Sequence, residues 1–542
     1  MKSSTKPLPT DVKKLQVLLV EKELEIQKLQ EKNLYLLEQF RLAQHVRFGR
    51  SSEVQAGQGE LFNEAESIVD DILDEAIVPE KETQRTPRKK PKRKPLPKDL
   101  PREIIVVDLT DEEKVCDGCG HDLHQMGEKT REQLKFIPAQ IKVIQTVRPQ
   151  YSCRHCEKNG THVSIKIAPA PKSPIPKGIA TPSLLSQIIT HKYQYSLPLY
   201  RQEALFKQHG IELNRKTMSE WMIKTSALFK PLVNRLHQAL LTQPVIQADE
   251  STLNVLNEAK TNCYMWVYCS GTDSPRDHGI KNIVLYDYQA SRAGKCAVDY
   301  LKGFNGYLQA DGYSGYEQVK AELIGCMAHA RRKFVEAQTA EPKNKRGRAT
   351  FALNTIAKLY RIEKNIKELP ANEKTAIREE HALPILNDFK KWLEKSIQQV
   401  LPKSAIGKAI QYSLNQWDKL SGYIKNGDIN IDNNRAERAI KPFVIGRKNW
   451  MFFGSAAGGE VAATMYTLIA SAARHQLDLW AYVDNVLRCL AAGAPNLEEL
   501  LPDRWKKTHP ESIRTYRKDE QEARQTKKRA RRAQRRNLAG QR

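Results

Sequence analysis

Apolar residues near the start of the chain recur at alternating spacings of three and four. One heptad position is occupied by Val12, Leu19, Ile26, Asn33 and Phe40. A single Asn in an apolar seam sets the register and the number of helices at some cost in stability, which favours a dimeric coiled coil over residues 1–50. Lys22 falls in the second seam position and weakens this coil. The alternative is an amphipathic helix that packs on its own domain.

A helical pattern returns over residues 178–235. Its amphipathic runs are Leu184 to Tyr193, Leu199 to Lys207 and Lys216 to Phe229. The polar break before the last run is typical of a helix-turn-helix unit, which would present Arg215 and Lys216 to DNA. A three-helix unit without a role in DNA binding is the alternative.

From Pro244 the apolar pattern alternates with a period of two, which predicts strands. The expected strands are Val245 to Asp249, Tyr264 to Cys269, Ile283 to Tyr288, Gly306 to Asp311 and Leu323 to Met327, with a helix from Gly294 to Leu301. This order predicts a mixed sheet with helical cover that begins within residues 240–340. Residues 341–430 are helical in pattern and are expected to be an insertion, after which the same domain resumes over residues 431–495. The chain is therefore expected to be a multidomain α+β protein.

The charge balance points to a polyanionic partner. The 542 residues include 88 Lys and Arg against 63 Asp and Glu, a net charge of +25, which favours nucleic acid over a membrane surface. Residues 51–100 are first acidic and then basic and rich in Pro. They predict an extended linker or an arm that lies along a DNA groove. The basic stretch 496–542 predicts a tail that raises non-specific affinity for DNA.

Hydropathy and cysteine usage favour a cytoplasmic protein. No run approaches the ~18 apolar residues of a membrane-spanning helix, so no membrane partner is expected. No apolar segment follows the polar start of the chain, which argues against secretion. The nine Cys include two close pairs, which indicates a reduced compartment and a metal site more than a disulfide framework.

The two cysteine pairs lie within residues 101–170. They are Cys116-x-x-Cys119 and Cys153-x-x-Cys156. Each pair can sit on a tight knuckle, and two knuckles supply the four thiolates of a tetrahedral Zn²⁺ ion. Four sulfur ligands leave no open position, so this zinc would be structural. Four core thiols or a redox pair are the alternatives.

The tripeptide Gln-Ala-Asp occurs twice, each time at the end of a predicted strand. Its acids are Asp249 and Asp311. A carboxylate at a strand end can point into a crevice while the rest of the strand stays in the core. Two such carboxylates on neighbouring strands could share a divalent ion, because Mg²⁺ prefers oxygen ligands.

A third acid, Glu437, lies in the polar segment from Asp432 to Pro442. It follows Asn434 by three residues, which is the spacing of a capping box in which the Glu reaches back to the N-cap amide. Several cations surround it in the sequence: Arg435, Arg438, Lys441, Arg447 and Lys448. Such crowding is expected where an enzyme holds phosphates beside a metal ion. The run from Trp450 to Gly454 favours a buried core strand, with stacking of a displaced base as the alternative.

Several motifs match one family when they are taken together. They are Asp249 in Gln-Ala-Asp-Glu, Asp311 in Gln-Ala-Asp-Gly-Tyr-x-Gly-Tyr, Asn433-Asn434-x-x-Glu437-Arg438, and Gly446-Arg447-Lys448-Asn449-Trp450. The set resembles the DDE transposases of the insertion sequence 66 family. The paired cysteines, the N-terminal coil, the segment from Arg47 to Glu53 and the segment from Ala328 to Phe334 match it too. The resemblance covers nearly the whole chain and weakens over the linker and the C-terminal end.

The resemblance implies an RNase H-like core, interrupted by a helical insertion, that binds the ends of a mobile element and joins them to target DNA. It makes Asp249, Asp311 and Glu437 the catalytic acids that hold Mg²⁺ or Mn²⁺. Bringing two element ends together implies self-association through the coil, and the family hints at companion proteins of the same element.

The sequence does not determine which basic residue near these acids binds phosphate. Some related transposases carry Tyr, Arg and Lys around the Glu, but here the seventh residue after Glu437 is Val444. Phosphate clamping therefore falls to one of the nearby cations Arg438, Lys441, Arg447 and Lys448. Arg331 and Arg332 are further candidates for contacts with DNA, while His329 either positions the scissile phosphate or water, or satisfies the core.

Two other functions are consistent with these residues. A metal-dependent nuclease on the same core would use the same ligands and cut DNA without joining it. A non-catalytic DNA-binding regulator would use the zinc module, the helical unit and the basic arms. Such a regulator would leave three acids in a basic surface without a purpose.

Overall fold

The computed structural model forms two compact units, Met1–Ile77 with Pro169–Arg542, and Val78–Ala168. The described residues are 12–48, 141–151, 166–258, 262–270, 282–340, 347–493, 495–515, 526 and 530. The predicted linker, the four paired cysteines and the end of the basic tail lie outside them. In the smaller unit, β1 (Gln150–Tyr151) pairs antiparallel with β2 (Lys166–Ile167).

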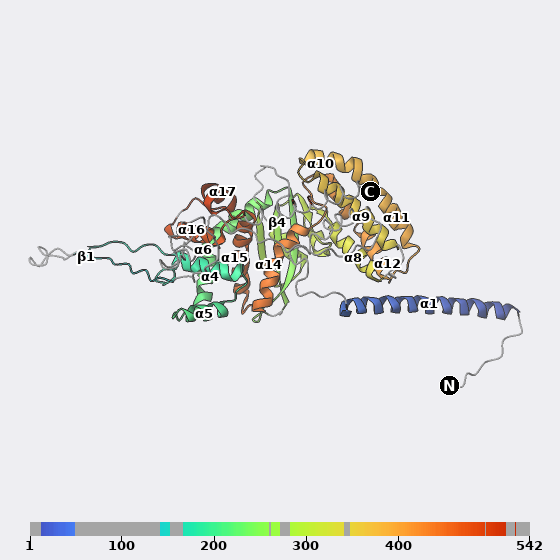
Figure 1. Ribbon diagram of the computed structural model, residues 1–542, viewed down its shortest axis with the longest axis horizontal. Helices are drawn as coiled ribbons and strands as arrows, with labels where there is room; N and C mark the ends of the chain where they lie inside the picture. The colour runs from blue at the N-terminus through green and yellow to red at the C-terminus, as the bar shows by residue number, and fades with distance from the viewer. Residues whose placement is uncertain are drawn as a thin grey trace, which may run out of the picture. The chain divides into compact units, whose positions relative to one another are not determined.

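A five-stranded mixed sheet in the order β5-β4-β3-β6-β7 forms the centre of the larger unit (Figure 1). Its strands are β3 (Val245–Asn254), β4 (Asn262–Ser270), β5 (Val284–Gln289), β6 (Tyr307–Gln309) and β7 (Glu322–Ile324). β4 is antiparallel to both β3 and β5, whereas β6 is parallel to β3 and β7 is parallel to β6. Within this sheet, β4 therefore runs against the other strands.

The first strand is longer than the sequence predicts. A strand was expected to end at Asp249, but β3 continues to Asn254 because β4 pairs with it along almost its whole length. β6 pairs with β3 only from Val245 to Gln247. Asp249 thus lies inside a strand, just beyond the point where pairing with β6 ends. The last predicted strand is shorter than expected, since β7 ends at Ile324 and Met327 already begins a helix.

Helices α14 (Asn434–Trp450) and α15 (Ala456–Arg474) pack on the sheet (Figure 1). α15 lies along the edge strand β5, where Thr467 Oγ1 accepts the N–H of Tyr286 at 2.9 Å and Ser471 Oγ accepts the N–H of Val284 at 3.0 Å. An open sheet edge would leave such N–H groups unpaired. The hydroxyl groups of α15 therefore close this edge.

The helical unit before the sheet consists of α4 (Pro182–Tyr193), α5 (Leu199–Gln208) and α6 (Arg215–Leu241). Asn214 caps α6 by accepting the N–H of Lys216 at 2.8 Å. The buried faces of α4 and α6 share one hydrophobic core with the sheet, α14, α15 and α16 (Leu479–Ala492). These helices are thus packed onto the sheet within the same unit.

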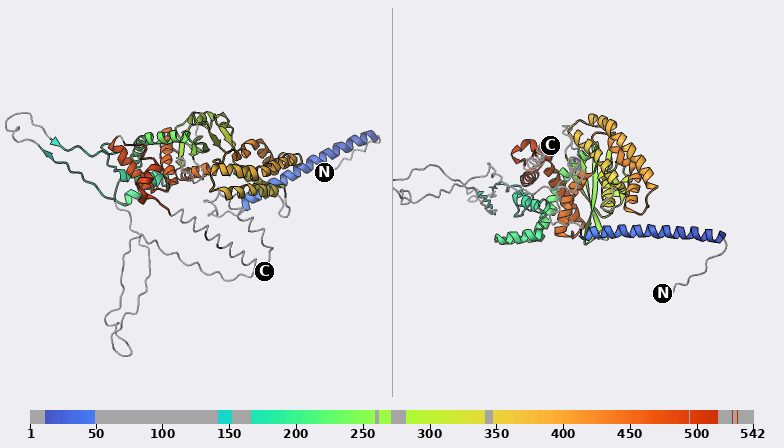
Figure 2. Two further views of the ribbon diagram at one scale, coloured as in Figure 1. Left: turned by 90° about the horizontal axis from the view of Figure 1, so that it is seen from above. Right: turned by 45° about the vertical axis from the view of Figure 1, so that its right-hand side comes forward.

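A group of helices after β7 has a hydrophobic core of its own, centred on residues such as Phe334, Leu359 and Phe389. It consists of α8 (Met327–Ala340), α9 (Arg348–Ile366), α10 (Ala371–Ile377), the π-helical turn η3 (Arg378–Ala382), α11 (Leu383–Ile397), α12 (Ala405–Asn415), α13 (Trp417–Ser421) and η4 (Gly422–Lys425). The group lies beside the sheet in Figures 1 and 2.

The remaining short elements are α7 (Gly294–Tyr300), η2 (Ser314–Gln318), α17 (Pro502–Thr508) and η5 (Pro510–Ser512). α1 (Val12–Phe48) covers the predicted coil segment, and apolar side chains such as Leu19, Leu29 and Phe40 are exposed on it. Across the described ranges, no helix is both long and apolar enough to cross a membrane.

Candidate active site

Asp249 lies in β3, just beyond the end of its pairing with β6. Because β6 pairs with β3 only as far as Gln247, Asp249 follows the end of that pairing by two residues. Its Oδ1 accepts the N–H of Glu250 at 2.9 Å. The next side chain, Glu250, is engaged elsewhere, since Arg292 Nε donates to it at 2.8 Å and the Tyr316 hydroxyl donates to it at 2.6 Å. Of these two adjacent acids, Glu250 is therefore the one whose carboxylate is already bound by neighbouring side chains.

Asp311 follows β6 by two residues and begins a tight turn. Its Oδ1 accepts the N–H of Tyr313 at 2.9 Å, and Gly312 has φ +96°, a conformation that favours glycine. The hydroxyl of Tyr412, on α12, donates to the Asp311 carbonyl at 3.0 Å. The turn is therefore anchored both by its own carboxylate and by the helical group.

The two Gln of the repeated tripeptide tie the site together. Both are almost fully buried, and Gln247 Nε2 donates to Gln309 Oε1 at 2.9 Å. Gln309 Nε2 donates to the Asn430 carbonyl at 2.7 Å, while Gln247 Oε1 accepts the N–H of Ala436 at 3.3 Å. Asn433 adds a further bond to β3, donating from Nδ2 to the Ala248 carbonyl at 2.8 Å. The first turn of α14 is thereby fastened across β3 and β6.

Glu437 occupies this first turn, and its carboxylate does not cap the helix. The N-cap is Asn433, which makes no side-chain capping bond, so the capping-box interpretation is wrong. The carboxylate instead faces α8, where Arg332 Nη2 lies 3.4 Å from Oε2 and His329 Nδ1 lies 3.5 Å from Oε1. Glu437 is buried. Its position is therefore set by contacts between helices and not by helix capping.

The charges of the neighbouring acids act on Asp249. Burial raises the pKa of Asp249 well above its usual value, and the negative charges of Glu250, Glu437 and Asp311 raise it further. Burial also lowers the pKa of His329, although the charge of Glu437 opposes this. Collecting buried and partly buried carboxylates costs free energy, and a bound divalent cation would offset that cost.

The donor set at these acids fits a hard divalent cation. All three side chains offer carboxylate oxygens, which Mg²⁺ and Mn²⁺ prefer. Oε1 of Glu437 is buried without a hydrogen-bond donor among the described residues. Among the described residues, one group of three potential metal ligands has its ligand atoms within 4.8 Å of one another: Cys326, His329 and Glu437. The carboxylates of the predicted triad do not meet this distance and are therefore spaced more widely.

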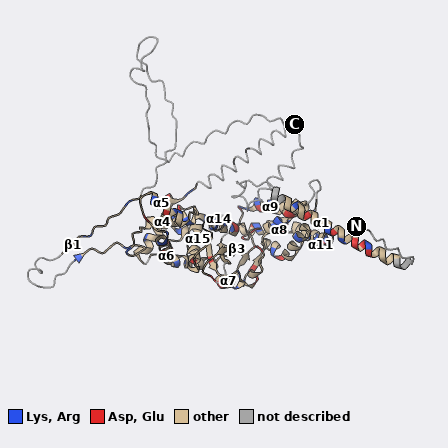
Figure 3. Ribbon diagram, turned by 90° about the horizontal axis from the view of Figure 1, so that it is seen from below, with Lys and Arg blue, Asp and Glu red and all other residues tan. Residues whose placement is uncertain are grey.

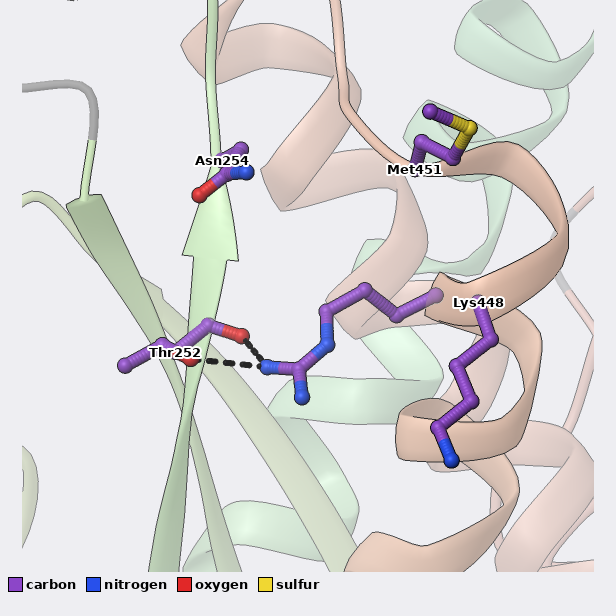
Figure 4. Close-up of a pocket in the computed structure, with 5 residues that line it drawn as sticks. Thr252, Asn254, Lys448 and Met451 are labelled. Carbon is purple, nitrogen blue, oxygen red and sulfur yellow. Dashed lines mark hydrogen bonds between the residues drawn. The ribbon is translucent and has the colours of Figure 1, made fainter.

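Two of the basic side chains predicted to contact phosphate, Arg447 and Lys448, lie near the C-terminal end of α14. Arg447 crosses from α14 to β3, donating from Nη1 to Thr252 Oγ1 at 2.9 Å and to Ser251 Oγ at 3.2 Å. Lys448 extends from the same helix and lines, together with Thr252 and Arg447, a surface hollow of about 320 Å³ (Figure 4). Arg447 is thus held by the strand that carries Asp249.

The other predicted phosphate ligands lie on three helices. Arg215 and Lys216 are exposed at the start of α6, and Arg331, Arg332, Arg438 and Lys441 are on α8 and α14. Arg331 is buried, and Arg332 contacts Glu437. Basic residues around α4, α5 and α14 can be followed in Figure 3.

The predicted strand from Trp450 to Gly454 is absent. α14 continues to Trp450, and Met451 follows it with φ +67°. Met451 and Phe452 are 65% and 48% exposed. Phe453 is buried and forms an isolated bridge with Val255 at the end of β3. The segment is thus a helix end with exposed apolar side chains and not a core strand.

Several residues of the site had no role in the sequence-based prediction. The paired Gln247 and Gln309 stood beside the predicted acids, and the period of two places each Gln on the same strand face as the Asp that follows it. Cys326, whose Sγ accepts the N–H of Asn433 at 3.2 Å, carried no signal of its own.

Comparison with known proteins identifies the family. A family model described as "Transposase IS66 family" matches residues 177–461, more than half of the chain. The chain belongs to the IS66 transposase family. The matched range contains Asp249, Asp311 and Glu437, the sheet and the helical group. As a member of this family, the chain is a DNA-processing enzyme with a transposase role, and its partner is DNA.

Two further family models match the N-terminal part of this IS66 transposase. One, described as "zinc-finger binding domain of transposase IS66", spans residues 113–157 and so includes the four paired cysteines. The other, described as "Transposase C of IS166 homeodomain", spans residues 35–105. The chain thus carries a zinc-finger domain before its transposase domain, as the cysteine spacing predicted.

Similar proteins occur in Sinorhizobium fredii (strain NBRC 101917 / NGR234). "Uncharacterized protein y4jD" is 34% identical over 413 residues, which cover 73% of this chain and 79% of that protein. "Uncharacterized protein y4hP" is 32% identical over 420 residues, covering 73% and 74% of the two chains. "Uncharacterized protein y4qI" is 31% identical over 417 residues, covering 74% and 76%.

Proposed function

We propose that this IS66 transposase is a DDE-type enzyme that binds the ends of a mobile element and catalyses metal-dependent strand cleavage and strand transfer into target DNA. The observation that carries the proposal is that hydrogen bonds join the three elements that bear the acids. Gln247, two residues before Asp249, donates to Gln309, two residues before Asp311. Asn433, at the start of the helix that carries Glu437, donates to the Ala248 carbonyl of β3. The strand order, with β4 alone reversed within the sheet, supports an RNase H-like core. The helices from α9 to η4 would form the insertion before Glu437, within the predicted range 341–430.

Asp249, Asp311 and Glu437 would hold two Mg²⁺ or Mn²⁺ ions. When bound, such ions activate the attacking oxygen and stabilise the leaving 3′ oxygen of the DNA strand. The protein contributes rigid placement of the acids, through the Gln247–Gln309 pair and the turn at Asp311. In this scheme no residue of the chain forms a covalent bond to DNA.

Basic residues around the acids would position the DNA phosphates. Lys448 is a candidate in the hollow beside β3, and Arg332 is a candidate next to Glu437. Arg215 and Lys216 are exposed where α6 begins and would contact DNA outside the reacting strand. Their positive charge would be retained without any metal, so DNA binding is expected to persist when a carboxylate is removed.

A strand-transfer assay with pre-cleaved element ends tests this proposal. Branched products that require Mg²⁺ or Mn²⁺ are expected. Nicks without joined products would assign a nuclease, and the absence of any metal-dependent cleavage of supercoiled plasmid would assign a non-catalytic DNA-binding regulator. Both of these results would contradict the proposal.

The four paired cysteines are proposed to bind one structural Zn²⁺ within the zinc-finger domain. Cys116, Cys119, Cys153 and Cys156 all fall inside the matched range. Thiolate ligands at this spacing suit tetrahedral zinc and leave no coordination position for a substrate. Removing the ion is therefore expected to unfold this domain without changing the chemistry at the acids.

Self-association is proposed to occur through α1. The helix exposes apolar side chains along its length, including Leu19 and Leu29 at predicted seam positions. Deleting residues 1–45 is expected to lower the mass measured by light scattering to that of a smaller assembly. In a coiled coil, the apolar seam of one helix is buried against that of its partner, and the deletion removes this contact. An unchanged mass would show that the chains associate elsewhere. Companion proteins of the same element would be further partners.

Gln309→Leu is expected to slow strand cleavage while DNA binding is retained. The substitution removes the bonds to Gln247 and to the Asn430 carbonyl and leaves buried polar groups unpaired, at a cost of about 1–3 kcal/mol. A displacement of Glu437 by about 1 Å can lower the rate about 10²-fold. Single-turnover cleavage measures the effect, with Gln289→Leu on β5 as the matched control. Equal rates for the two variants would contradict the positioning role.

A further inference from the structure

Beside the proposed triad lies a second group of ligating side chains. Cys326 precedes α8, His329 lies in its first turn, and Glu437 reaches them from α14. One ligand atom from each lies within 4.8 Å of the other two. Cys326 and Glu437 are buried, and His329 is partly buried. The group therefore combines a thiol, an imidazole and a carboxylate in one enclosed place.

Two of these atoms are buried without hydrogen bonds. His329 Nδ1 and Glu437 Oε1 face each other at 3.5 Å, and neither has a hydrogen-bond partner among the described residues. Buried polar atoms left unpaired cost free energy, so such a pair calls for an explanation. Ligand bonds of about 2.0–2.1 Å to a tetrahedral zinc ion separate a nitrogen and an oxygen ligand by about 3.3–3.5 Å. The observed spacing fits two ligands of one ion better than it fits a hydrogen bond.

Burial raises the pKa of the Cys326 thiol, and the charges of Asp432 and Glu437 raise it further, so the sulfur is a neutral thiol until a metal ion displaces its proton. The Asn433 N–H donates to Sγ at 3.2 Å, and the backbone of His329 also bonds to it. These two N–H groups partly oppose that rise, and a metal ion binds the sulfur as the thiolate with release of its proton. A thiolate and an imidazole select Zn²⁺ over Mg²⁺, which prefers oxygen ligands.

We propose that Cys326, His329 and Glu437 form a binding site for Zn²⁺ that shares Glu437 with the magnesium-binding acids. Binding forms one bond from zinc to each side chain and releases the thiol proton of Cys326 to solvent. A water molecule completes the tetrahedron. Zinc bound here withdraws Glu437 from Asp249 and Asp311 and inhibits strand cleavage. This inhibitory effect rests on the proposed function, whereas zinc binding itself does not.

Zinc content of the full-length protein tests the site without reference to activity. Wild type and variants are dialysed at a fixed micromolar free zinc concentration and analysed by plasma mass spectrometry. Wild type is expected to hold one zinc per chain more than Cys326→Ala and His329→Ala. Cys489→Ala, which removes a partly buried thiol on α16, is expected to match wild type. Equal zinc content in wild type and both site variants would overturn the proposal.

Loss of folding is controlled in the same preparations. Melting curves without added zinc compare each variant with wild type, and Cys326→Ser provides a second variant that keeps a small polar group in the buried position. A folded Cys326→Ser protein with the zinc content of wild type would also overturn the proposal.

Inhibition is measured as strand cleavage in millimolar Mg²⁺ with increasing Zn²⁺, each protein relative to its own rate without zinc. Cys326→Ala is expected to raise the inhibitory zinc concentration at least about 10–100-fold, because loss of an outer-shell partner alone has an effect of this size. Zinc binding without inhibition would overturn the sharing of Glu437 and leave the proposed function intact. Absence of strand transfer in Mg²⁺, together with the extra zinc, would instead contradict the proposed function alone.

Discussion

Asp249→Asn is expected to abolish strand cleavage and strand transfer while binding to element ends remains. Asp249 lies within β3, two residues beyond the end of its pairing with β6, and the charges of Asp311 and Glu437 raise the pKa of its carboxyl. Asn has nearly the same shape but lacks the negative charge that a divalent ion requires. A rate loss of at least ~10³-fold is expected, which corresponds to about 4 kcal/mol of transition-state stabilisation. Single-turnover cleavage of labelled element ends measures this loss, and gel-shift titration measures DNA binding.

The matched control for this substitution is Asp299→Asn. Asp299 is exposed on α7, so its replacement tests the loss of one negative charge without a change at the site. Cleavage by this control is expected to stay close to wild type. Wild-type cleavage by Asp249→Asn, or an equal loss in both variants, would remove the basis for assigning Asp249 to the reaction.

Arg378→Met is expected to cause the largest loss of stability among substitutions in the helical group. The guanidinium is fully buried and forms two bonds with Glu363, at 2.9 and 2.6 Å. It also donates to the carbonyls of Tyr423, Asn426 and Ile429 at 2.8 to 3.0 Å. Removing one partner of a buried ion pair leaves the other charge uncompensated, at a cost of about 3–5 kcal/mol. Urea unfolding followed by tryptophan fluorescence measures the shift.

This ion pair also bears on the active site. Ile429 lies immediately before the segment that Gln309 and Gln247 fasten to the sheet ahead of α14. Arg378→Met is therefore expected to lower cleavage as well as stability. Arg348→Met, on an exposed position of α9, is the control and is expected to change stability by less than ~0.5 kcal/mol. Similar unfolding midpoints for the two variants would show that the buried pair is not required.

The strands and their acids could be predicted from the sequence because their signals are local. Alternation of apolar residues located β4 and β5 closely, and the repeated tripeptide pointed to Asp249 and Asp311. The end of β3 could not be predicted, because its outer half is held by pairing with β4 and not by its own apolar residues. Pairing between strands is a tertiary property that overrides local pattern.

The surroundings of Glu437 were harder to predict for a related reason. Its spacing from Asn434 matched a capping box, yet the carboxylate faces His329 and Arg332 on a helix about a hundred residues earlier in the chain. Such contacts depend on how α8 and α14 pack, which no local pattern encodes. The same holds for Cys326, which stood outside every motif that carried chemistry in the sequence.

A crystal structure of the protein soaked with Mn²⁺ tests the central claim most directly. Anomalous density is expected beyond the end of the β3–β6 pairing, within about 2.0–2.4 Å of carboxylate oxygens of Asp249, Asp311 and Glu437. Density that contacts none of these acids, in protein that is active under the same conditions, would contradict the account.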